Sequence, residues 1–275
     1  MSVKDQFNLA GRVAVITGGA GLLGVKHAEA IAEMGGIPIL ADVDGKRAQA
    51  AAAQIAARHA GTAAGYQVDI TRPASVKKLR DLLLKKFSRI DILINNAARN
   101  PKVEGGGGKN WSRLENYPLE QWEQDVAVGL TGALVCSQIF GAEMARAGRG
   151  VILNVASDLG VIAPDQRIYR RAGVSEAQQM VKPVSYSVVK HGLVGLTKYL
   201  ATYWAEQGVR ANAISPGGVF NEQDRAFVRK LTALIPLGRM AQPDEYKAAV
   251  VFLVSDASQY MTGANLVIDG GRSTW

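Results

Sequence analysis

The amino-acid sequence predicts an α/β fold in which a doubly wound parallel sheet of seven strands carries helices on both faces. Two observations lead to this prediction. Short apolar runs, bounded by glycine or polar residues, alternate along the chain with longer stretches of helical periodicity. Several of the apolar runs end in Asp, Asn or Ser, as strands do at the ligand-binding edge of such a sheet. The chain has 275 residues, 48% of them hydrophobic, which is enough for one large domain with a substantial core.

The N-terminal half of the chain repeats strand and helix. The first expected strand, residues 12–16, is apolar throughout, which is typical of a strand buried on both faces. Further strands are expected at residues 37–41, 65–68 and 91–94, with helices running to residue 34 and over residues 45–59 and 73–87. Repeated units of this length produce a Rossmann-type sheet, whose ligand lies at the carboxyl ends of the strands.

The C-terminal half continues the pattern with two irregular segments. Residues 99–118 are rich in glycine, and we predict a mobile loop there. Residues 158–182 form a polar segment without clear periodicity. The remaining elements are expected as helices at residues 119–147, 183–207 and 243–254 and as strands at residues 150–155, 210–214 and 265–268. No internal repeat or linker interrupts the chain, so residues 1–275 are predicted to form one domain.

The composition argues against several classes of function. The net charge is +8, but the basic residues are scattered, so we expect no nucleic-acid partner. No apolar run reaches the ~20 residues of a membrane helix, and residues 1–11 lack a signal-peptide pattern, so we expect a cytoplasmic protein without a membrane partner. Cys136 is the single cysteine and the three histidines show no ligand spacing, so no disulfide and no metal site are expected.

A glycine-rich turn follows the first strand. Residues 17–24 read Thr-Gly-Gly-Ala-Gly-Leu-Leu-Gly and lead into a helix. In this context backbone N–H groups approach a pyrophosphate, which the helix N-terminus stabilises. The second strand ends in Asp42, whose carboxylate can accept both hydroxyls of an adenosine ribose and would repel a 2′-phosphate. We therefore predict NAD, in preference to NADP, as the cofactor.

Tyr186 and Lys190 are one helical turn apart and would project from the same helix face. A neighbouring cation favours the phenolate and lowers the pKa of a tyrosine below its usual ~10. Such a pair suits proton transfer between an alcohol and a ketone. The spacing alone is common by chance, so its place among the other motifs decides its meaning.

Taken in order, these motifs resemble the short-chain dehydrogenase/reductase superfamily over almost the whole chain. The order is the glycine turn, Asp42, Asp69, Asn95-Asn96-Ala97, Ser157, Tyr186 with Lys190, Pro216-Gly217 and Asp269-Gly270-Gly271. The resemblance implies that Tyr186 is the general acid/base. It also implies that Lys190 lowers the Tyr186 pKa and holds the nicotinamide ribose, and that Ser157 orients the substrate oxygen.

The resemblance also implies a set of cofactor-binding residues. Asp69 would meet the adenine amino group, and Asn95 and Ala97 would line the adenosine and ribose side. Besides Tyr186 and Lys190, the expected set is Gly18, Gly21, Leu22, Leu23, Gly24, Asp42, Val43, Asp69, Ile70, Asn96, Ala97, Ala98, Pro216, Gly217, Val219 and Asn221.

Three positions depart from the family pattern. Leu22 stands where the middle glycine of the turn is usual, so either Gly21 supplies that flexibility or the turn is reshaped. Gly129 stands where the family carries an asparagine whose main-chain carbonyl holds a relay water; glycine keeps the carbonyl but loosens the helix around it. Asn221 replaces a threonine, and its amide can still bond the nicotinamide carboxamide.

The segment between Ser157 and Tyr186 bears on the substrate. These residues are 29 apart, more than is common in the family, and the extra length carries Arg167, Tyr169 and Arg170. Arginine forks suit carboxylate or phosphate, and the polar residues suit sugar hydroxyls; a solvated surface loop is the alternative. The segment is similar to that of a bacterial subgroup associated with surface-sugar and nonulosonic-acid pathways. We expect a polar, sugar-like or anionic small molecule as substrate.

The predicted activity is an NAD(H)-dependent interconversion of a secondary alcohol and a ketone. Two alternatives stay open. A 3-oxoacyl thioester reductase is one, although Asp42 and the polar segment argue against it. A non-catalytic cofactor-binding sensor or scaffold is the other, and Gly129 favours it. The helices at residues 119–147 and 183–207 are apolar beyond one face, which together with the resemblance predicts a homo-oligomer, either a dimer or a tetramer.

Overall fold

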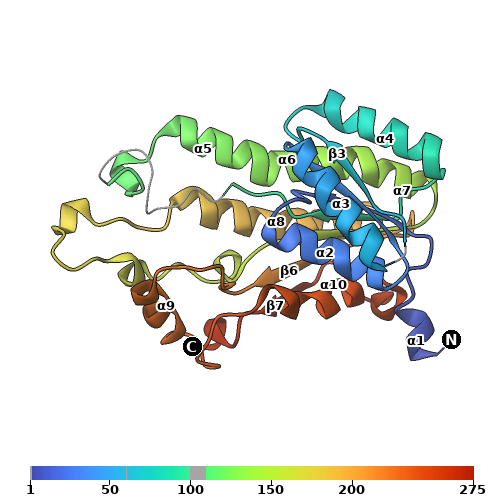
Figure 1. Ribbon diagram of the computed structural model, residues 1–275. Coiled ribbons are helices and arrows are strands. Elements are labelled where there is room, and N and C mark those ends of the chain that lie inside the picture. Colours follow the sequence, from blue (N-terminus) through green and yellow to red (C-terminus); the bar gives the residue numbers. More distant parts are fainter. Residues whose placement is uncertain (1, 60, 100–109) are drawn as a thin grey trace.

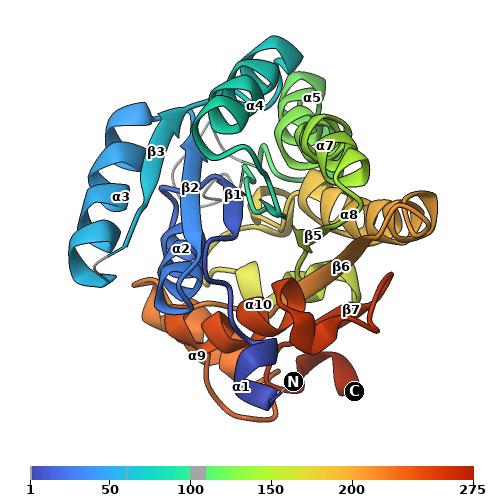
Figure 2. The same ribbon diagram turned by 90° about the vertical axis from the view of Figure 1, so that its right-hand side faces the viewer.

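A computed structural model of the chain, which describes residues 2–59, 61–99 and 110–275, contains a seven-stranded parallel sheet (Figures 1 and 2). The strands lie in the order β3-β2-β1-β4-β5-β6-β7. Their bounds are Val13–Thr17 (β1), Ile37–Asp42 (β2), Ala64–Gln67 (β3), Ile92–Asn95 (β4), Gly150–Val155 (β5), Val209–Pro216 (β6) and Asn265–Ile268 (β7). The strand order reverses where β1 and β4 pair, and this switch point creates a crevice at the carboxyl ends of the strands.

Helices cover both faces of the sheet (Figure 2). One face carries α2 (Leu22–Glu33), α3 (Gly45–His59) and α10 (Lys247–Val254). The other carries α4 (Pro73–Phe87), a long helix at residues 119–146 and α8 (Val184–Tyr203). The predicted fold class is therefore confirmed. One sheet takes its strands from residue 13 to residue 268, which supports the prediction of one domain.

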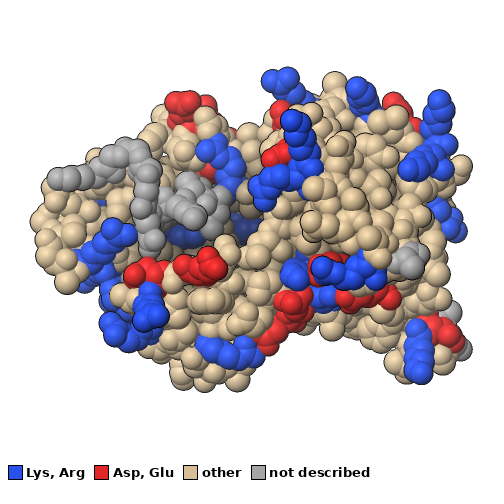
Figure 3. Space-filling view, in the orientation of Figure 1, with Lys and Arg blue, Asp and Glu red and all other residues tan. Residues whose placement is uncertain are grey.

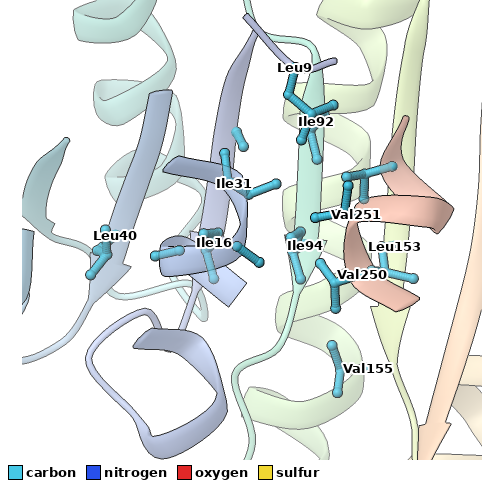
Figure 4. Close-up of a cluster of buried hydrophobic side chains, with 14 of the residues drawn as sticks. Leu9, Ile16, Ile31, Leu40, Ile92, Ile94, Leu153, Val155, Val250 and Val251 are labelled. Carbon is cyan, nitrogen blue, oxygen red and sulfur yellow. The ribbon is translucent and has the colours of Figure 1, made fainter. Parts of the chain in front are cut away.

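The two hydrophobic cores follow from the alternation of side chains along buried strands. In β1, Ala14 and Ile16 belong to the core under α2 and α10, whereas Val13 and Val15 belong to the core on the opposite face. Figure 4 shows the first core, in which Ile31 of α2 lies near Ile16 of the sheet. Continuous apolar strands, which the sequence showed, are thus explained by a sheet that is buried on both sides.

The long helix at residues 119–146 is continuous but not uniform. Its α-helical parts α5 (Leu119–Val126), α6 (Gly132–Cys136) and α7 (Ala142–Arg146) are joined by π-helical turns at Ala127–Thr131 and Ser137–Gly141. By length and composition this helix could cross a membrane, but half of its most apolar window is buried inside the protein. It packs against α4 and α8, as a core helix does.

The structure differs from the expected elements in a few places. Two helices, α1 (Val3–Gln6) and α9 (Arg225–Thr232), were not predicted. They have four and eight residues, too few to show a recognisable period. α8 ends at Tyr203 and not near residue 207, and a 3-10 turn at Pro243–Tyr246 precedes α10.

The two irregular segments touch each other. Residues 158–182 contain 3-10 turns at Asp158–Gly160, Gln166–Tyr169 and Glu176–Gln178. The Arg113 side chain donates to the carbonyl oxygen of Glu176 over 2.8 Å, and the backbone N–H of Val181 donates to Ser112 Oγ over 3.0 Å. The predicted mobile loop at 99–118 is thus tied down beyond residue 110, while residues 100–109 lie outside the described residues. Its mobility stays a prediction.

Charged side chains of both signs are interspersed over the face shown in Figure 3. Among the ion pairs of the structure, Glu29 of α2 contacts Lys26, Arg58 and Lys247. On this face the positive net charge is therefore spread out and partly neutralised.

Candidate active site

A pocket of about 730 Å³ opens at the carboxyl ends of the strands. One end is formed by the glycine-rich turn, and the other by Ser157, Tyr186 and Lys190. Nearly all the residues predicted to bind cofactor line it: Gly18, Gly21, Leu22, Leu23, Asp42, Val43, Asp69, Ile70, Asn96, Ala97, Ala98, Pro216, Gly217, Val219 and Asn221. Gly24 does not line it.

The glycine-rich turn between β1 and α2 is shaped by close backbone contacts. Gly18 has a φ of +61°, and a Cβ there would lie 2.9 Å from the Cα of Ala97. A Cβ on Gly24 would collide with the carbonyl oxygen of Gly18, so Gly24 acts through packing. The N-cap of α2 is Gly21, which offers no side-chain hydrogen bond, so the first N–H groups of the helix face a ligand site without a protein cap.

Leu22 occupies the position where the family pattern has the middle glycine of the turn. It is the first residue of α2, lines the pocket and is 43% exposed, so its side chain has room. Gly21 before it has φ −79° and ψ 171°, an extended conformation that any residue can adopt. The turn therefore does not use Gly21 in a left-handed conformation to replace the missing glycine.

Asp42 is the last residue of β2 and lines the pocket beside the glycine turn. Its Oδ2 accepts a hydrogen bond from the backbone N–H of Ala20 over 3.0 Å, and its Oδ1 accepts one from that of Asp44 over 3.1 Å. These contacts fix the carboxylate beside the turn. The Arg47 guanidinium donates to the carbonyl oxygen of Ala20 over 3.1 Å, which places a cation near the same corner.

Asp69 occupies the neighbouring corner after β3. Its Oδ1 accepts from the Thr71 hydroxyl over 2.6 Å, and its Oδ2 lies 3.3 Å from Arg72 Nε. The carboxylate lines the pocket while these neighbours hold it, so contact with an adenine amino group stays a prediction.

Asn95 and Asn96 point in different directions. Asn96 lines the pocket, and its Nδ2 donates to the carbonyl oxygens of Thr17 over 2.9 Å and Gly18 over 3.1 Å, which holds the glycine turn. Asn95 is buried, and its Nδ2 donates to Asn154 Oδ1 over 2.9 Å. The prediction that Asn95 lines the adenosine side is therefore wrong, because successive side chains along a strand point to opposite sides.

At the other end of the pocket, Ser157, Tyr186 and Lys190 come together. Ser157 follows β5, whereas Tyr186 and Lys190 lie in the first two turns of α8. Lys190 Nζ donates to the carbonyl oxygen of Val155 over 2.7 Å and lies 5.8 Å from the centre of the Tyr186 ring. The hydrogen bond to Val155 ties α8 to the end of β5, so the predicted pair faces the predicted serine.

Burial has the largest influence on the pKa values at this end. It raises the pKa of Tyr186, an interaction with the Ser157 hydroxyl works against the rise, and the negative charge of Asp158 adds to it. Burial also lowers the pKa of Lys190 to about 8, and the like charge of Lys182 contributes. The pKa of Tyr186 is thus raised and not lowered as expected from Lys190, because desolvation of the phenolate is the largest cause of its shift.

Three charged residues at this end were not assigned from the sequence. Asp158, Lys182 and Arg272 all line the pocket. The Lys182 ammonium lies 3.8 Å from the centre of the Tyr186 ring, and burial lowers its pKa to about 8. Asp158 directly follows the predicted serine, a signal that could have been used, whereas no local pattern marks Lys182 or Arg272.

Of the three residues predicted to bind substrate, only Tyr169 lines the pocket. Arg167 has a side chain that is 77% exposed and pairs with Asp165. Arg170 is also exposed and pairs with Glu176. The structure does not bring these two arginines to the pocket, because carboxylates of their own segment hold them at the surface.

The presence of glycine at position 129 is explained by the packing of two helices. Gly129 lies in the π-helical turn at Ala127–Thr131, where the long helix meets α8. A Cβ on Gly129 would lie 2.5 Å from Val189 Cγ1. Glycine at this position therefore permits the close approach of the two helices, and an asparagine would need Val189 to move.

No metal centre is seen in the part of the chain that the structure describes, where no three His, Cys, Asp or Glu side chains are grouped to hold an ion.

A doubly wound sheet with a glycine-rich turn at its switch point defines the class of dinucleotide-binding folds. A family model described as enoyl-(acyl carrier protein) reductase matches residues 20–273. The chain belongs to the short-chain dehydrogenase/reductase superfamily, as the order of its motifs predicted.

Two of the curated relatives match over nearly their whole length. The chain is 37% identical to a D-threitol dehydrogenase of Mycolicibacterium smegmatis, covering 98% of this chain and 96% of the relative. It is 34% identical to an NAD-dependent glycerol dehydrogenase of Listeria innocua, again covering 98% and 96%. These names support an oxidoreductase of small molecules.

Solved structures include both nicotinamide cofactors. A gluconate 5-dehydrogenase from Burkholderia cenocepacia in complex with NADP and tartrate superposes with a TM-score of 0.85, at 27% identity and full coverage of both chains. A xylitol dehydrogenase bound to NAD+ gives a TM-score of 0.81 at 25% identity, covering 96% of this chain and 99% of the other. The superfamily fold therefore does not by itself decide between NAD and NADP.

Proposed function

We propose that the protein is an NAD(H)-dependent dehydrogenase that interconverts a secondary alcohol of a polyol or sugar-like molecule and the corresponding ketone. The observation that carries the proposal is the meeting of Ser157, Tyr186 and Lys190 at one end of a pocket whose other end is a glycine-rich turn. The threitol and glycerol dehydrogenases among the relatives support a polyol as substrate.

The cofactor end fits a nicotinamide dinucleotide. The uncapped start of α2 and the left-handed Gly18 suit a pyrophosphate that approaches the backbone. Asp42 suits the two hydroxyls of an adenosine ribose, and its charge opposes a 2′-phosphate, which favours NAD over NADP. Lys190 would hold the nicotinamide ribose. When bound, the nicotinamide supplies the hydride acceptor for oxidation and the hydride donor for reduction.

Tyr186 would move the proton. In alcohol oxidation its phenolate oxygen accepts the proton of the substrate hydroxyl, and in ketone reduction its phenol gives that proton back. Ser157 would hold the substrate oxygen beside Tyr186. Lys190 and Lys182 would stabilise the phenolate by their charge, against the burial that disfavours it.

The substrate end combines polar groups with an apolar wall. Asp158 and Arg272 form a buried ion pair, so Arg272 is already neutralised. Ile168, Leu231 and Met240 belong to a small hydrophobic cluster and also line the pocket. Hydroxyl groups on a short aliphatic chain match this mixture better than a strongly anionic group does, which favours a neutral polyol.

The alternatives have less support. Relatives named as polyol and hydroxysteroid dehydrogenases do not favour a 3-oxoacyl thioester reductase. A non-catalytic sensor was favoured by Gly129, and that residue now has a packing explanation. The surface-sugar subgroup, the cytoplasmic location and the homo-oligomer stay predictions.

Titration with NADH and NADPH, followed by a panel of polyols, sugars and sugar phosphates read at 340 nm, tests the proposal. We expect NADH to bind more tightly than NADPH and a vicinal polyol to be turned over. Tighter binding of NADPH would remove the argument from Asp42. Cofactor binding without turnover of any alcohol or ketone would favour the sensor.

A further inference from the structure

We propose that Asp158 and Arg272 are positioning residues for the Ser157 hydroxyl, so that the C-terminal segment at residues 269–275 is part of the catalytic site. The inference deepens the proposed dehydrogenase function and rests on it. It starts from a chain of three side chains, Ser157, Asp158 and Arg272, that joins the end of β5 to the C-terminal turn.

The first link fixes the rotation of a hydroxyl. Ser157 Oγ donates its single proton to Asp158 Oδ1 over 2.7 Å. The same oxygen accepts a hydrogen bond from the backbone N–H of Leu159 over 3.2 Å. One lone pair of Ser157 then remains for the Tyr186 hydroxyl. Asp158 thus holds the Ser157 side chain beside Tyr186 in the free enzyme, and the Ser157 proton turns from Asp158 Oδ1 to a substrate oxygen when one binds.

The second link keeps Asp158 ionised and in place. Asp158 Oδ2 accepts from Arg272 Nη1 over 2.6 Å, and the two side chains are only 5% and 7% exposed. A carboxylate buried this deeply needs a paired cation. The backbone N–H of Leu159 gives Oδ1 a second hydrogen bond, over 2.8 Å. Asp158 is therefore an acceptor on both oxygens, which is the state that captures the Ser157 proton.

The third link explains the Asp269-Gly270-Gly271 motif, to which sequence reasoning gave no chemical role. Asp269 accepts the backbone N–H groups of Gly271 over 2.9 Å and Ser273 over 2.8 Å. Gly270 and Gly271 have φ values of +69° and +89°. Together these form a tight turn that delivers Arg272 into the protein, 114 residues along the chain from Asp158.

The ion pair of Asp158 and Arg272 also bears on the pKa of Tyr186. The negative charge of Asp158 acts on Tyr186 and raises its pKa. Arg272 carries the opposite charge 2.6 Å from Asp158, so its loss would leave the Asp158 charge unpaired near the phenol. Loss of Arg272 alone should therefore affect both the position of Ser157 and the pH at which Tyr186 ionises.

A double-mutant cycle tests the first link. kcat and KM are measured with NAD and the polyol substrate for Asp158→Asn, Ser157→Ala and the double variant. If Asp158 acts through Ser157, Asp158→Asn lowers kcat by about 10- to 100-fold, leaves the KM for NAD unchanged and has no further effect once Ser157 is alanine. Asp256→Asn is the matched control, because Asp256 pairs with Arg12, which directly precedes β1 at the amino ends of the strands and does not line the pocket.

Arg272 needs a different design, since Arg272→Met leaves a buried carboxylate unpaired and can prevent folding. Arg272→Lys keeps the cation and should retain most of the activity. Asp158→Asn/Arg272→Met removes both charges, should fold, and should match the low kcat of Asp158→Asn. A folded Arg272→Met should also shift the pH profile of kcat/KM toward higher pH. An Asp158→Asn variant with wild-type kcat, or one that loses activity equally in the Ser157→Ala background, overturns the proposal.

A crystal structure of Asp158→Ala gives a readout that does not need turnover. We expect the Ser157 side chain to leave the rotamer that now faces Asp158, and to keep that rotamer in Asp256→Asn. An unchanged Ser157 would contradict the positioning role even if no substrate were found. Conversely, a wild-type enzyme that turns over an alcohol, with normal kcat in Asp158→Asn, would overturn this inference and leave the proposed function intact.

Discussion

The Lys182 ammonium lies 3.8 Å from the centre of the Tyr186 ring, closer than Lys190, whose ammonium lies 5.8 Å away. Spacing along α8 pointed to Lys190, whereas Lys182 comes from the irregular segment before the helix. Two lysine side chains thus approach a phenol whose burial favours the neutral form. The balance between burial and these charges sets the pH at which Tyr186 can accept a proton.

Alcohol oxidation should therefore speed up as the pH rises. Burial raises the pKa of Tyr186, so the phenolate is scarce at pH 7 and increases with pH, and kcat/KM should follow it. Burial lowers the pKa of Lys182 to about 8, so its charge acts on Tyr186 only below about that pH. In that range Lys182→Met removes a neighbouring cation, favours the neutral phenol and should lower kcat/KM by about 10-fold. Lys182→Arg keeps the charge and serves as the control. An unchanged kcat/KM of Lys182→Met in that pH range would show that Lys182 has no electrostatic role.

Cofactor preference should depend on Asp42. Asp42→Ser removes the carboxylate beside the glycine turn and leaves Arg47, which already bonds Ala20, near a 2′-phosphate. We expect the ratio of kcat/KM for NAD over NADP to fall by about 10- to 100-fold, the scale of losing a charged hydrogen bond. Asp44→Asn, two residues away and exposed, should leave the ratio unchanged. A constant ratio in Asp42→Ser would place the discrimination elsewhere.

The packing of the long helix on α8 should be sensitive at Gly129. Gly129→Ala places a Cβ 2.5 Å from Val189 Cγ1 and should destabilise the protein by about 1–3 kcal/mol in urea unfolding. Gly129→Ala/Val189→Ala makes room for that Cβ and should recover part of the loss. Gly129→Asn would meet the same contact with Val189. A loss of activity in that variant would therefore not show whether the family's asparagine matters for catalysis. If Gly129→Ala were as stable as wild type, the close approach would not be what requires glycine.

The start of the catalytic helix should depend on Asp125 of α5. This buried carboxylate accepts hydrogen bonds from Tyr117 Oη over 2.8 Å and from Ser185 Oγ over 2.6 Å, next to Tyr186. Asp125→Ala leaves both hydroxyls without this partner and should cost about 1–3 kcal/mol of stability. Glu123→Ala, on an exposed position of the same helix, should be neutral by the same urea measurement. Equal stability of the two variants would refute the anchoring role.

Local sequence patterns were enough for the fold and for most of the residues that line the pocket beside the glycine turn. Apolar strands, the glycine turn and Asp42 at the end of β2 are all marked by short runs of consecutive residues. The structure places the turn and Asp42 together at the carboxyl ends of the strands. The same patterns could not tell which of Asn95 and Asn96 faces the pocket, because that depends on the residue at which β4 ends. Only the structure shows that Asn95 bonds Asn154 in the core.

The substrate end depends on contacts between distant residues. Arg272 and Asp158 are 114 residues apart in the sequence, and no local sequence pattern around either residue predicts that they pair. Arg167 and Arg170 carried the expected chemistry, but a charge pattern does not reveal which side chain faces a pocket and which pairs with a carboxylate at the surface. From the sequence, Gly129 favoured a non-catalytic protein. The position of Val189 explains the glycine by packing.

The central claim is that Tyr186 is the proton-transfer residue of an NAD-dependent alcohol dehydrogenase. The most direct test compares Tyr186→Phe with Tyr199→Phe, an exposed tyrosine of the same helix, in NADH formation from NAD and a vicinal polyol. The account predicts that Tyr186→Phe binds NADH as the wild type does and loses activity by at least about 100-fold, while Tyr199→Phe keeps it. Retained turnover in Tyr186→Phe would contradict the account.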